Sequence, residues 1–266
     1  MQRAMKADFH AHSGDDPRDS LCYSTEMLID EAAEHGIEVL AITLHEWMEC
    51  SPRLSRYADR KGVLLIPAIE QNVEGNHLLM LNPDREQAGA TTFADLRALG
   101  RRDAAFIAPH PFYPLGSCLG RALSVNIDLF DAIEYCTLYG RGINWPNWLA
   151  ARAARRHGLP LVGTSDTHTL PYVSSTHTLV TAEKTVDGVI EAIRQGRVEL
   201  VTAPRPWPAL FRLVAGLSAG IAWDIIRSVW NNRFRLRPTA TRTYAPGDLH
   251  PAFAPVPTPT STATAS

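Results

Sequence analysis

The residues best suited to chemistry in this sequence stand where short apolar stretches end. His10 and His12 are two positions apart in ADFHAH, and side chains two apart on a strand point the same way. Asp166 and His168 repeat this spacing after LPLVGTS. Each pair therefore presents two metal-binding groups in one direction. Imidazole and carboxylate are natural ligands of zinc, manganese and iron.

Four further candidate ligands flank other apolar stretches: His45, Glu70, His77 and His110. A lone histidine at such a place is more often a hydrogen-bonding residue than a ligand, and H-x-H alone is a short pattern. Six histidines and two carboxylates together at strand ends are more than chance placement of unrelated residues would produce. Buried together without a metal or hydrogen-bond partners, these groups would be costly. We therefore predict a metal site.

The other four histidines serve as controls. His35 and His157 each precede a glycine at a predicted helix end, where a histidine interacts favourably with the helix dipole. His177 lies in a short predicted strand and His250 in the C-terminal tail. We assign a ligand role to none of them.

The elements that must position these residues alternate from residue 6 to about 203. Strands are predicted at 7–12, 37–43, 63–70, 76–82, 104–111, 131–136, 159–165, 175–180 and 198–202. Helices are predicted at 24–36, 51–62, 91–102, 144–158 and 185–196. The alternation indicates an α/β fold with a mostly parallel sheet and helices outside. About seven strand–helix units favour a barrel, which carries its chemistry at the carboxyl ends of the strands.

Bulk composition excludes several classes of protein. The 266 residues are 45% hydrophobic and 20% charged, as in soluble globular proteins, and the net charge of −2 argues against a long nucleic acid held along a groove. The four cysteines form no C-x-x-C pair, and the N-terminus has no apolar core of signal-peptide length. These features predict a cytoplasmic protein. No G-x-G-x-x-G, Walker or G-x-S-x-G motif is present.

The chain changes character at Pro204. Residues 204–237 are predicted to form an amphipathic helical extension that docks on the barrel, because an apolar stripe recurs at helical spacing. The stripe consists of Leu210, Val214, Leu217, Ile221 and Ile225. It is too short to span a bilayer, so the alternative is a helix on a membrane surface or partner, with Trp207, Trp223 and Trp230 as anchors. Residues 238–266, rich in Pro, Thr, Ala and Ser, are predicted to be disordered.

Five motifs, taken in order, resemble the PHP family, named for polymerase and histidinol phosphatase. They are DFHAHS, GIEVLAITLH, LLIPAIEQNVEGNHLLML, IAPHP and LVGTSDTH, and they span residues 8 to 168. The resemblance implies that residues 1–203 form a distorted (β/α)7, TIM-like barrel with two or three divalent ions (Zn, Mn or Fe) in a cleft.

The resemblance also implies which residues hold each ion. The first ion would be bound by His10, His12, Glu70 and Asp166, and the second by Glu70, as a bridge, with His77 and His110. His45 and His168 would hold a third, with Asp15 or Asp16. At Leu44 the sequence departs from the family, many members of which have aspartate before this histidine. The third site therefore lacks that local support.

Ions around a bridging carboxylate suit hydrolysis at phosphorus. We therefore predict a metal-dependent phosphoesterase of the nucleotide phosphatase or 5'-3' exonuclease type. A metal-bound hydroxide is expected to attack a small phosphate ester or the end of a short oligonucleotide, without a protein nucleophile. Glu134 is predicted to orient a ligand histidine, and Arg121 and Arg141 to contact the phosphate. An ordinary structural role is the alternative for all three.

Other functions remain open at the level of sequence. Histidinol phosphate is one alternative substrate. An amidohydrolase barrel also begins with H-x-H but commonly bridges two metals with a lysine, and here Lys61 lies at a predicted helix end. A third alternative is a non-catalytic binding or regulatory barrel that retains its metals, with the C-terminal helix recruiting a partner or a membrane.

Overall fold

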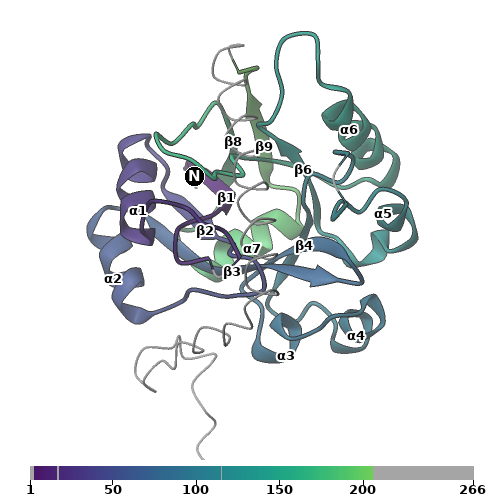
Figure 1. Cartoon of the computed structure of the whole chain (residues 1–266). Coiled ribbons are helices and arrows are strands. Elements are labelled where there is room, and N and C mark those ends of the chain that lie inside the picture. Colours follow the sequence, from purple (N-terminus) through teal and green to yellow (C-terminus); the bar gives the residue numbers. More distant parts are fainter. Residues whose placement is uncertain (1–2, 17, 115, 206–266) are drawn as a thin grey trace, which may run out of the picture.

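The computed structural model describes residues 3–16, 18–114 and 116–205. The predicted extension lies outside the described residues except for its first two positions, and the predicted tail lies outside them entirely. Within the described part, nine strands form one sheet that curls into a nearly closed barrel (Figure 1). The strands are β1 (Ala4–Ala11), β2 (Val39–Ile42), β3 (Leu64–Val73), β4 (Asn76–Leu81), β5 (Ala105–Ala108), β6 (Ala132–Cys136), β7 (Leu161–Thr164), β8 (Thr176–Thr181) and β9 (Val198–Thr202).

The strand directions confirm the predicted distorted α/β barrel. The order across the sheet is β7-β6-β5-β4-β3-β2-β1-β8-β9. β4 runs antiparallel to β3 and β5, and β8 runs antiparallel to β1 and β9. The remaining seven strands run in one direction, so their carboxyl ends open at a common rim. β4 starts at that rim because it runs the opposite way.

Helices surround the barrel and cover its other end. They are α1 (Thr25–Glu34), α2 (Pro52–Arg60), α3 (Arg85–Ala88), α4 (Phe93–Leu99), α5 (Arg121–Val125), α6 (Trp145–His157) and α7 (Val186–Arg194), with a 3-10 turn at Ile127–Leu129. α1 and α2 lie on one side of the barrel and α5 and α6 on the other (Figure 1). The short α3, α5 and the 3-10 turn were not predicted, because three to five residues are too few to show a helical period.

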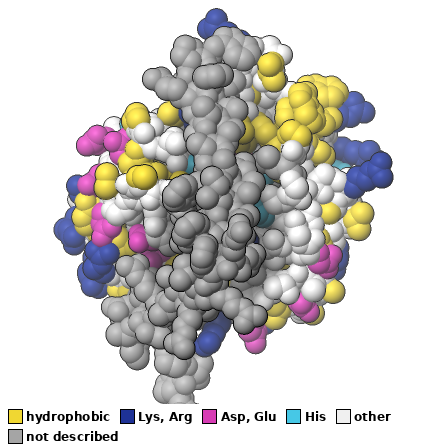
Figure 2. Space-filling view, in the orientation of Figure 1, with side chains coloured by type: hydrophobic (Ala, Val, Ile, Leu, Met, Phe, Trp, Pro, Cys, Tyr) yellow, Lys and Arg dark blue, Asp and Glu magenta, His cyan; other side chains and the backbone are white. Residues whose placement is uncertain are grey.

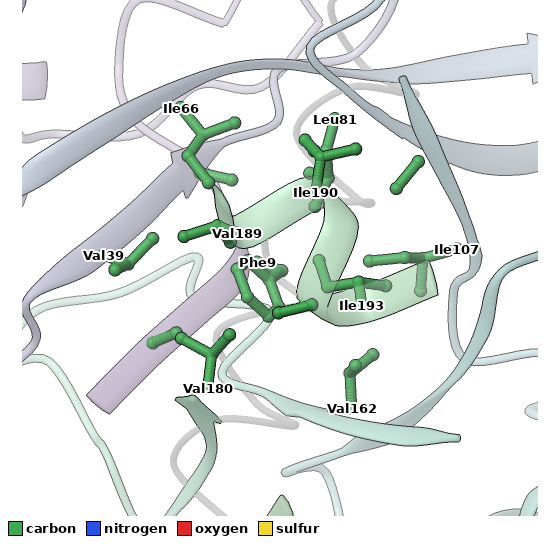
Figure 3. Packing of buried hydrophobic residues seen from close by; sticks show 14 of the residues in the cluster. Phe9, Val39, Ile66, Leu81, Ile107, Val162, Val180, Val189, Ile190 and Ile193 are labelled. Atoms are coloured by element: carbon green, nitrogen blue, oxygen red, sulfur yellow. The ribbon is translucent and has the colours of Figure 1, made fainter. Parts of the chain in front are cut away.

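The barrel core packs against α7. Val189, Ile190 and Ile193 of this helix face Phe9 of β1 and Val180 of β8 in one buried cluster (Figure 3). Phe9 and its neighbours Ala7 and Ala11 alternate along β1 with the polar Asp8 and His10, and all five are fully buried. One side of β1 therefore anchors the strand in apolar surroundings while the other carries the polar groups.

The barrel closes where β1 and β7 end. The Asp166 amide donates to the His10 carbonyl at 2.9 Å, and the His12 amide donates to the Thr167 carbonyl at 3.1 Å. Nearer the start of β1, the β8–β9 hairpin fills the gap between these strands, and the Thr178 hydroxyl donates to the Gly163 carbonyl. The closure places the residues after β7 directly beside His10 and His12.

The outer surface is ordinary apart from one area. Hydrophobic side chains gather over the α6 side in Figure 2, where Ile143, Trp145 and Trp148 are more than half exposed. No helix in the described ranges is both long and apolar enough to cross a bilayer.

Candidate metal centre

Four side chains converge at the rim where β1, β3 and β7 end. The Nε2 atoms of His10 and His12 are 3.1 Å apart. Glu70 Oε2 lies 3.4 and 3.3 Å from these two nitrogens, and Asp166 Oδ1 lies 3.4 and 3.6 Å from them. A tetrahedral ion with ligands at about 2.1 Å has ligand–ligand edges of about 3.4 Å. His10, His12 and Asp166 are therefore spaced for a shared ion, and Glu70 Oε2 lies at a coordination-like distance from both histidines.

The second oxygen of Glu70 faces two other histidines. Oε1 lies 2.7 Å from His77 Nδ1, at the start of β4, and 3.3 Å from His110 Nε2, just beyond β5. Glu70 itself is 2% exposed. His45 Nε2 approaches the other oxygen, Oε2, at 3.2 Å. Groups spaced for a shared ion are His10, Glu70 and His110, and His45, Glu70 and His77. The Glu70 carboxylate thus contacts three sets of histidines: the His10–His12 pair, the His77–His110 pair, and His45.

A further group lies on the far side of His12 and includes two aspartates from the loop after β1. Asp16 Oδ2 is 3.0 Å from His45 Nδ1 and 3.4 Å from His12 Nδ1. Asp19 Oδ2 is 3.5 Å from the same His45 nitrogen and 3.3 Å from His168 Nε2. Asp16, Asp19, His12 and His45 are spaced for a shared ion.

The loop after β1 distinguishes the two aspartates between which the sequence left a choice. Asp16 belongs to the histidine group, whereas Asp15 accepts a hydrogen bond from the Thr25 hydroxyl at the start of α1. Leu44 is fully buried in an apolar cluster with the α1 side chains. The backbone amide of His45 donates to Asp16 at 2.8 Å, so this loop supports His45 in place of a carboxylate at position 44.

Asp19 is a member of the cluster that sequence reasoning missed. It follows the H-x-H pair by seven positions in a loop without regular structure, where spacing predicts no direction. Its Oδ2 atom is buried and receives no hydrogen bond within the described part of the chain, although it faces three imidazoles at 3.3 to 3.9 Å. A buried carboxylate oxygen without a donor needs a cation, so the donor set fits a metal ion here.

Two buried carboxylates support the centre from behind. Glu134 on β6 accepts hydrogen bonds from His10 Nδ1 at 2.8 Å, from the Thr164 hydroxyl and from the His110 amide. It therefore contacts a candidate ligand histidine, in the position proposed from its place at a strand end. Asp8 was missed, because one polar residue inside a strand gives no signal of its own. It accepts from the Ser165 amide at 3.0 Å and from the Tyr172 hydroxyl.

The charges of the cluster shift the pKa values of its members strongly. Burial acts to lower the pKa of His10, but Asp166, Glu134 and Glu70 outweigh it and raise this pKa well above its usual range. For His168, burial is likewise outweighed by Asp166 and Asp19, which raise its pKa to about 9. The pKa of Glu70 lies well below its usual range, since the surrounding imidazoles outweigh burial. The cluster therefore attracts positive charge, either as protons or as metal ions.

Two candidate ligands have unusual backbone conformations. His110 has φ of 28° and Asp166 has φ of 45°, in the left-handed region that residues with a Cβ seldom occupy. Each lies two residues beyond the end of a strand that reaches the rim, β5 and β7 respectively. Such strain persists only where the surroundings impose it, and it concentrates at functional sites.

The remaining predicted residues lie apart from the cluster. Arg121 and Arg141 are exposed, and neither forms a hydrogen bond or ion pair within the described ranges. Of the control histidines, His35 caps α1, His157 ends α6 and His177 lies on β8 beside Ser174. His250 lies outside the described residues. Only small areas of histidine surface are visible on the face drawn in Figure 2.

Comparison with known proteins agrees with this geometry. A family model described as PHP-associated matches residues 144–198, from the start of α6 to β9. A two-domain protein from Bacteroides vulgatus ATCC 8482, containing a predicted PHP-like metal-dependent phosphoesterase, aligns with a TM-score of 0.57 at 20% identity over 76% of this chain. The described chain therefore has the fold of a PHP-like protein, and residues 144–198 match a PHP-associated model. It covers 65% of that two-domain protein, which is less than two thirds of its length.

Two other solved structures show how widely this PHP fold is used. PsfC from Pseudomonas syringae PB-5123 aligns with a TM-score of 0.58 at 18% identity, over 79% of this chain and 96% of that one. The lesion-specific endonuclease PfuEndoQ from Pyrococcus furiosus aligns at 0.50 and 14% identity, over 74% and 57%. No curated protein matches the sequence. At these identities the likeness concerns the PHP fold, and the reaction is argued from the residues.

Proposed function

We propose that this protein is a PHP-family metal-dependent phosphoesterase whose ions are held by the eight predicted ligands together with Asp16 and Asp19. The observation that carries the proposal is Glu70. One of its oxygens shares a coordination-like spacing with His10 and His12, while the other faces His77 and His110. A bridging carboxylate of this kind would support two ions close together, an arrangement that can stabilise both the attacking and the leaving oxygen of an in-line displacement at phosphorus.

The chemistry divides between the ions and the chain. When bound, the ions supply an activated water and neutralise negative charge on the phosphate and on the leaving oxygen. Glu134 accepts a hydrogen bond from His10 Nδ1, so Nε2 is the nitrogen that would bind an ion once its own proton has left. The Ser165 hydroxyl accepts from Thr167 at 2.7 Å and donates to the His10 carbonyl, so it supports the strands and does not act as a nucleophile.

The lysines argue against the amidohydrolase alternative. The whole sequence contains three, Lys6, Lys61 and Lys184. Lys6 Nζ donates to Ser174 and to a helix-end carbonyl, Lys61 Nζ pairs with Asp30, and Lys184 Nζ donates to a loop carbonyl. None is spaced to bridge two ions with the histidines. Hydrolysis at phosphorus therefore accounts for the donor set better than hydrolysis at carbon.

We infer that the substrate is a small phosphate ester, such as a nucleotide, or the end of a short oligonucleotide. The net charge of −2 gives the chain little overall attraction for a long nucleic acid. Histidinol phosphate fits the same centre, and the test below includes it.

The test measures metal content and hydrolysis together. Protein purified without chelator is expected to contain two or more transition ions per chain, and Glu70→Gln is expected to lose most of them. The exposed Glu199→Gln on β9 is the matched control. The loaded protein is then assayed on nucleotide monophosphates and bisphosphates, short oligonucleotides and histidinol phosphate. Failure to bind zinc, manganese or iron would exclude the mechanism, and full loading without hydrolysis of any ester would favour the non-catalytic barrel.

A further inference from the structure

Arg205 is a buried arginine to which the candidate metal centre, as described so far, gives no role. It follows β9 and is only 6% exposed. Its backbone amide donates to the Tyr139 carbonyl at 3.1 Å, and it forms a parallel bridge with Gly140 in the loop after β6. Its Nε donates to the Thr137 hydroxyl at 3.3 Å. Arg205 is thus held at two points. Its backbone amide is bound by Tyr139, and its guanidinium group is bound by Thr137.

The position of Arg205 follows from the direction of β9. This strand pairs antiparallel with β8, which pairs antiparallel with β1, so β9 runs parallel to β1. Its carboxyl end therefore opens at the rim that carries the histidines. Thr137, the partner of the Arg205 guanidinium, directly follows Cys136 at the end of β6, and the Cys136 thiol lies 3.9 Å from Asp166 Oδ2. Arg205 thus lies on the Asp166 side of the centre.

The charge of Arg205 lacks an anionic partner among the described residues. No carboxylate there lies within ion-pair distance, and Thr137 is its one side-chain hydrogen-bond partner. The ion-paired arginines at positions 97, 101 and 102 sit instead at the surface, with side chains 38 to 43% exposed. Removing a charge from water without a counter-charge is expensive. Burial accordingly lowers the pKa of Arg205.

We propose that Arg205 binds the phosphoryl group of the substrate through its two Nη atoms, an assignment that rests on the proposed phosphoesterase function. A planar guanidinium matches two phosphate oxygens at once. Because Nε is engaged by Thr137, the Nη edge is the part left to meet the anion. The ions would hold the phosphate from the Glu70 side, while Arg205 fixes its orientation from the Asp166 side.

This assignment differs from the one made from sequence alone. Arg121 and Arg141 were chosen because they follow rim strands, but both are exposed. Arg205 also follows a rim strand, and in addition it is buried, held by Thr137 and without a counter-charge among the residues that the structure describes. A single buried guanidinium beside the ions suits a terminal phosphate, which presents several free oxygens, better than a phosphate within a chain.

The experiment uses the metal-loaded full-length chain and inorganic phosphate as the probe. The inhibition constant of phosphate and the KM of the best ester are compared for wild type, Arg205→Gln and Arg205→Lys, with the exposed Arg156→Gln on α6 as the control. Arg205→Gln is expected to raise both constants on the order of 10- to 100-fold, as loss of a charged hydrogen-bond pair does. Metal content should stay at the wild-type value. The two constants of Arg205→Lys should lie between those of wild type and Arg205→Gln. Lysine keeps the positive charge but cannot bind two phosphate oxygens side by side.

Chemical rescue separates binding from a structural role. Free guanidinium added to Arg205→Ala should restore part of the phosphate affinity, which a role in folding would not allow. Unchanged constants in a folded, metal-loaded Arg205→Gln would overturn the proposal, as would a loss of metal that accounts for the whole effect. If Arg205→Gln does not fold, the Lys variant decides by the same criterion. A loaded wild type that neither binds phosphate nor hydrolyses any ester would instead overturn the proposed function.

Discussion

The imidazole of His10 is held from both sides of its ring. Nδ1 donates to Glu134, while Nε2 lies within 3.4 Å of His12, Glu70 and Asp166. The first contact favours the neutral tautomer with the proton on Nδ1, so Nε2 offers its lone pair to an ion when its own proton is released. A carboxylate behind the ring also makes the imidazole a stronger donor to the metal.

Replacing Glu134 by Gln should weaken metal binding by about 10- to 100-fold, the usual cost of losing a partner behind a ligand. The amide also turns an NH₂ group toward donors that Glu134 now accepts from, including the His110 amide. Competition with a chelator of known affinity measures the effect, with Glu199→Gln as the control. Equal affinities in both variants would show that Glu134 is structural only.

Metal uptake should release protons. Because the pKa of His10 and His110 is raised well above the usual range, and that of His168 to about 9, these imidazoles are protonated at neutral pH in the metal-free chain. Coordination requires the neutral form, so the apparent affinity should rise with pH from about 7 to 9. Calorimetry in two buffers of different ionisation enthalpy counts the protons. Identical heats in both buffers would contradict the prediction.

The same shifts affect the stability of the metal-free fold. A histidine whose pKa rises on folding stabilises the fold fully below its unfolded pKa of about 6.5. For His168, this contribution is lost as pH rises through about 9. Chelated protein should therefore melt at a lower temperature at pH 9 than at pH 7, and the metal-loaded protein should show a smaller difference.

At the scale of elements, the segment between β7 and β8 connects the ligands to the barrel. It carries Asp166 and His168, and it is tied to β1 through Asp8, which binds the Ser165 amide and the Tyr172 hydroxyl. Burial raises the pKa of Asp8 and Tyr172 is 2% exposed, so their hydrogen bond is made in dry surroundings. Its loss leaves a buried carboxyl group with one fewer donor.

Tyr172→Phe should lower the free energy of unfolding by about 1–3 kcal/mol, the cost of an unsatisfied buried polar group. Urea unfolding of the metal-loaded protein measures it. Tyr57→Phe is the matched control, because its hydroxyl also donates to an aspartate, Asp30, but in a pair that is only partly buried. A loss of stability no greater than that of the control would show that the Asp8–Tyr172 contact is not needed to hold this segment.

Most of the strands and long helices were predictable from the sequence. The strands are short apolar runs, and several of the helices begin at a serine or threonine cap. Ser24 and Thr185 accept hydrogen bonds at the starts of α1 and α7, where their patterns begin. The eight ligand candidates fell at strand ends and do converge. Asp19 and Arg205 escaped prediction for a shared reason. Their roles depend on how an irregular loop and the last strand return to the rim, which local spacing does not encode.

At the scale of the whole molecule, the candidate centre joins elements from all parts of the described chain. Its groups come from β1, from the ends of β2 and β3, from the start of β4, and from the segments after β5 and β7. β1 and β7 themselves are joined by two backbone hydrogen bonds and one bridge. Ions in the centre would therefore hold the barrel closed at the point where its own ladder is weakest.

Metal removal should consequently destabilise the entire barrel and not just the rim. At a free ion concentration 100 times its dissociation constant, one bound ion stabilises the fold by about 2.7 kcal/mol. For a domain of this size that corresponds to roughly 5–10 °C in Tm. Calorimetric melting before and after chelation measures the shift, and restored zinc or manganese should reverse it in a single transition. Stoichiometric loss of metal without any shift in Tm would mean that backbone pairing alone closes the barrel and that the ions serve only the reaction.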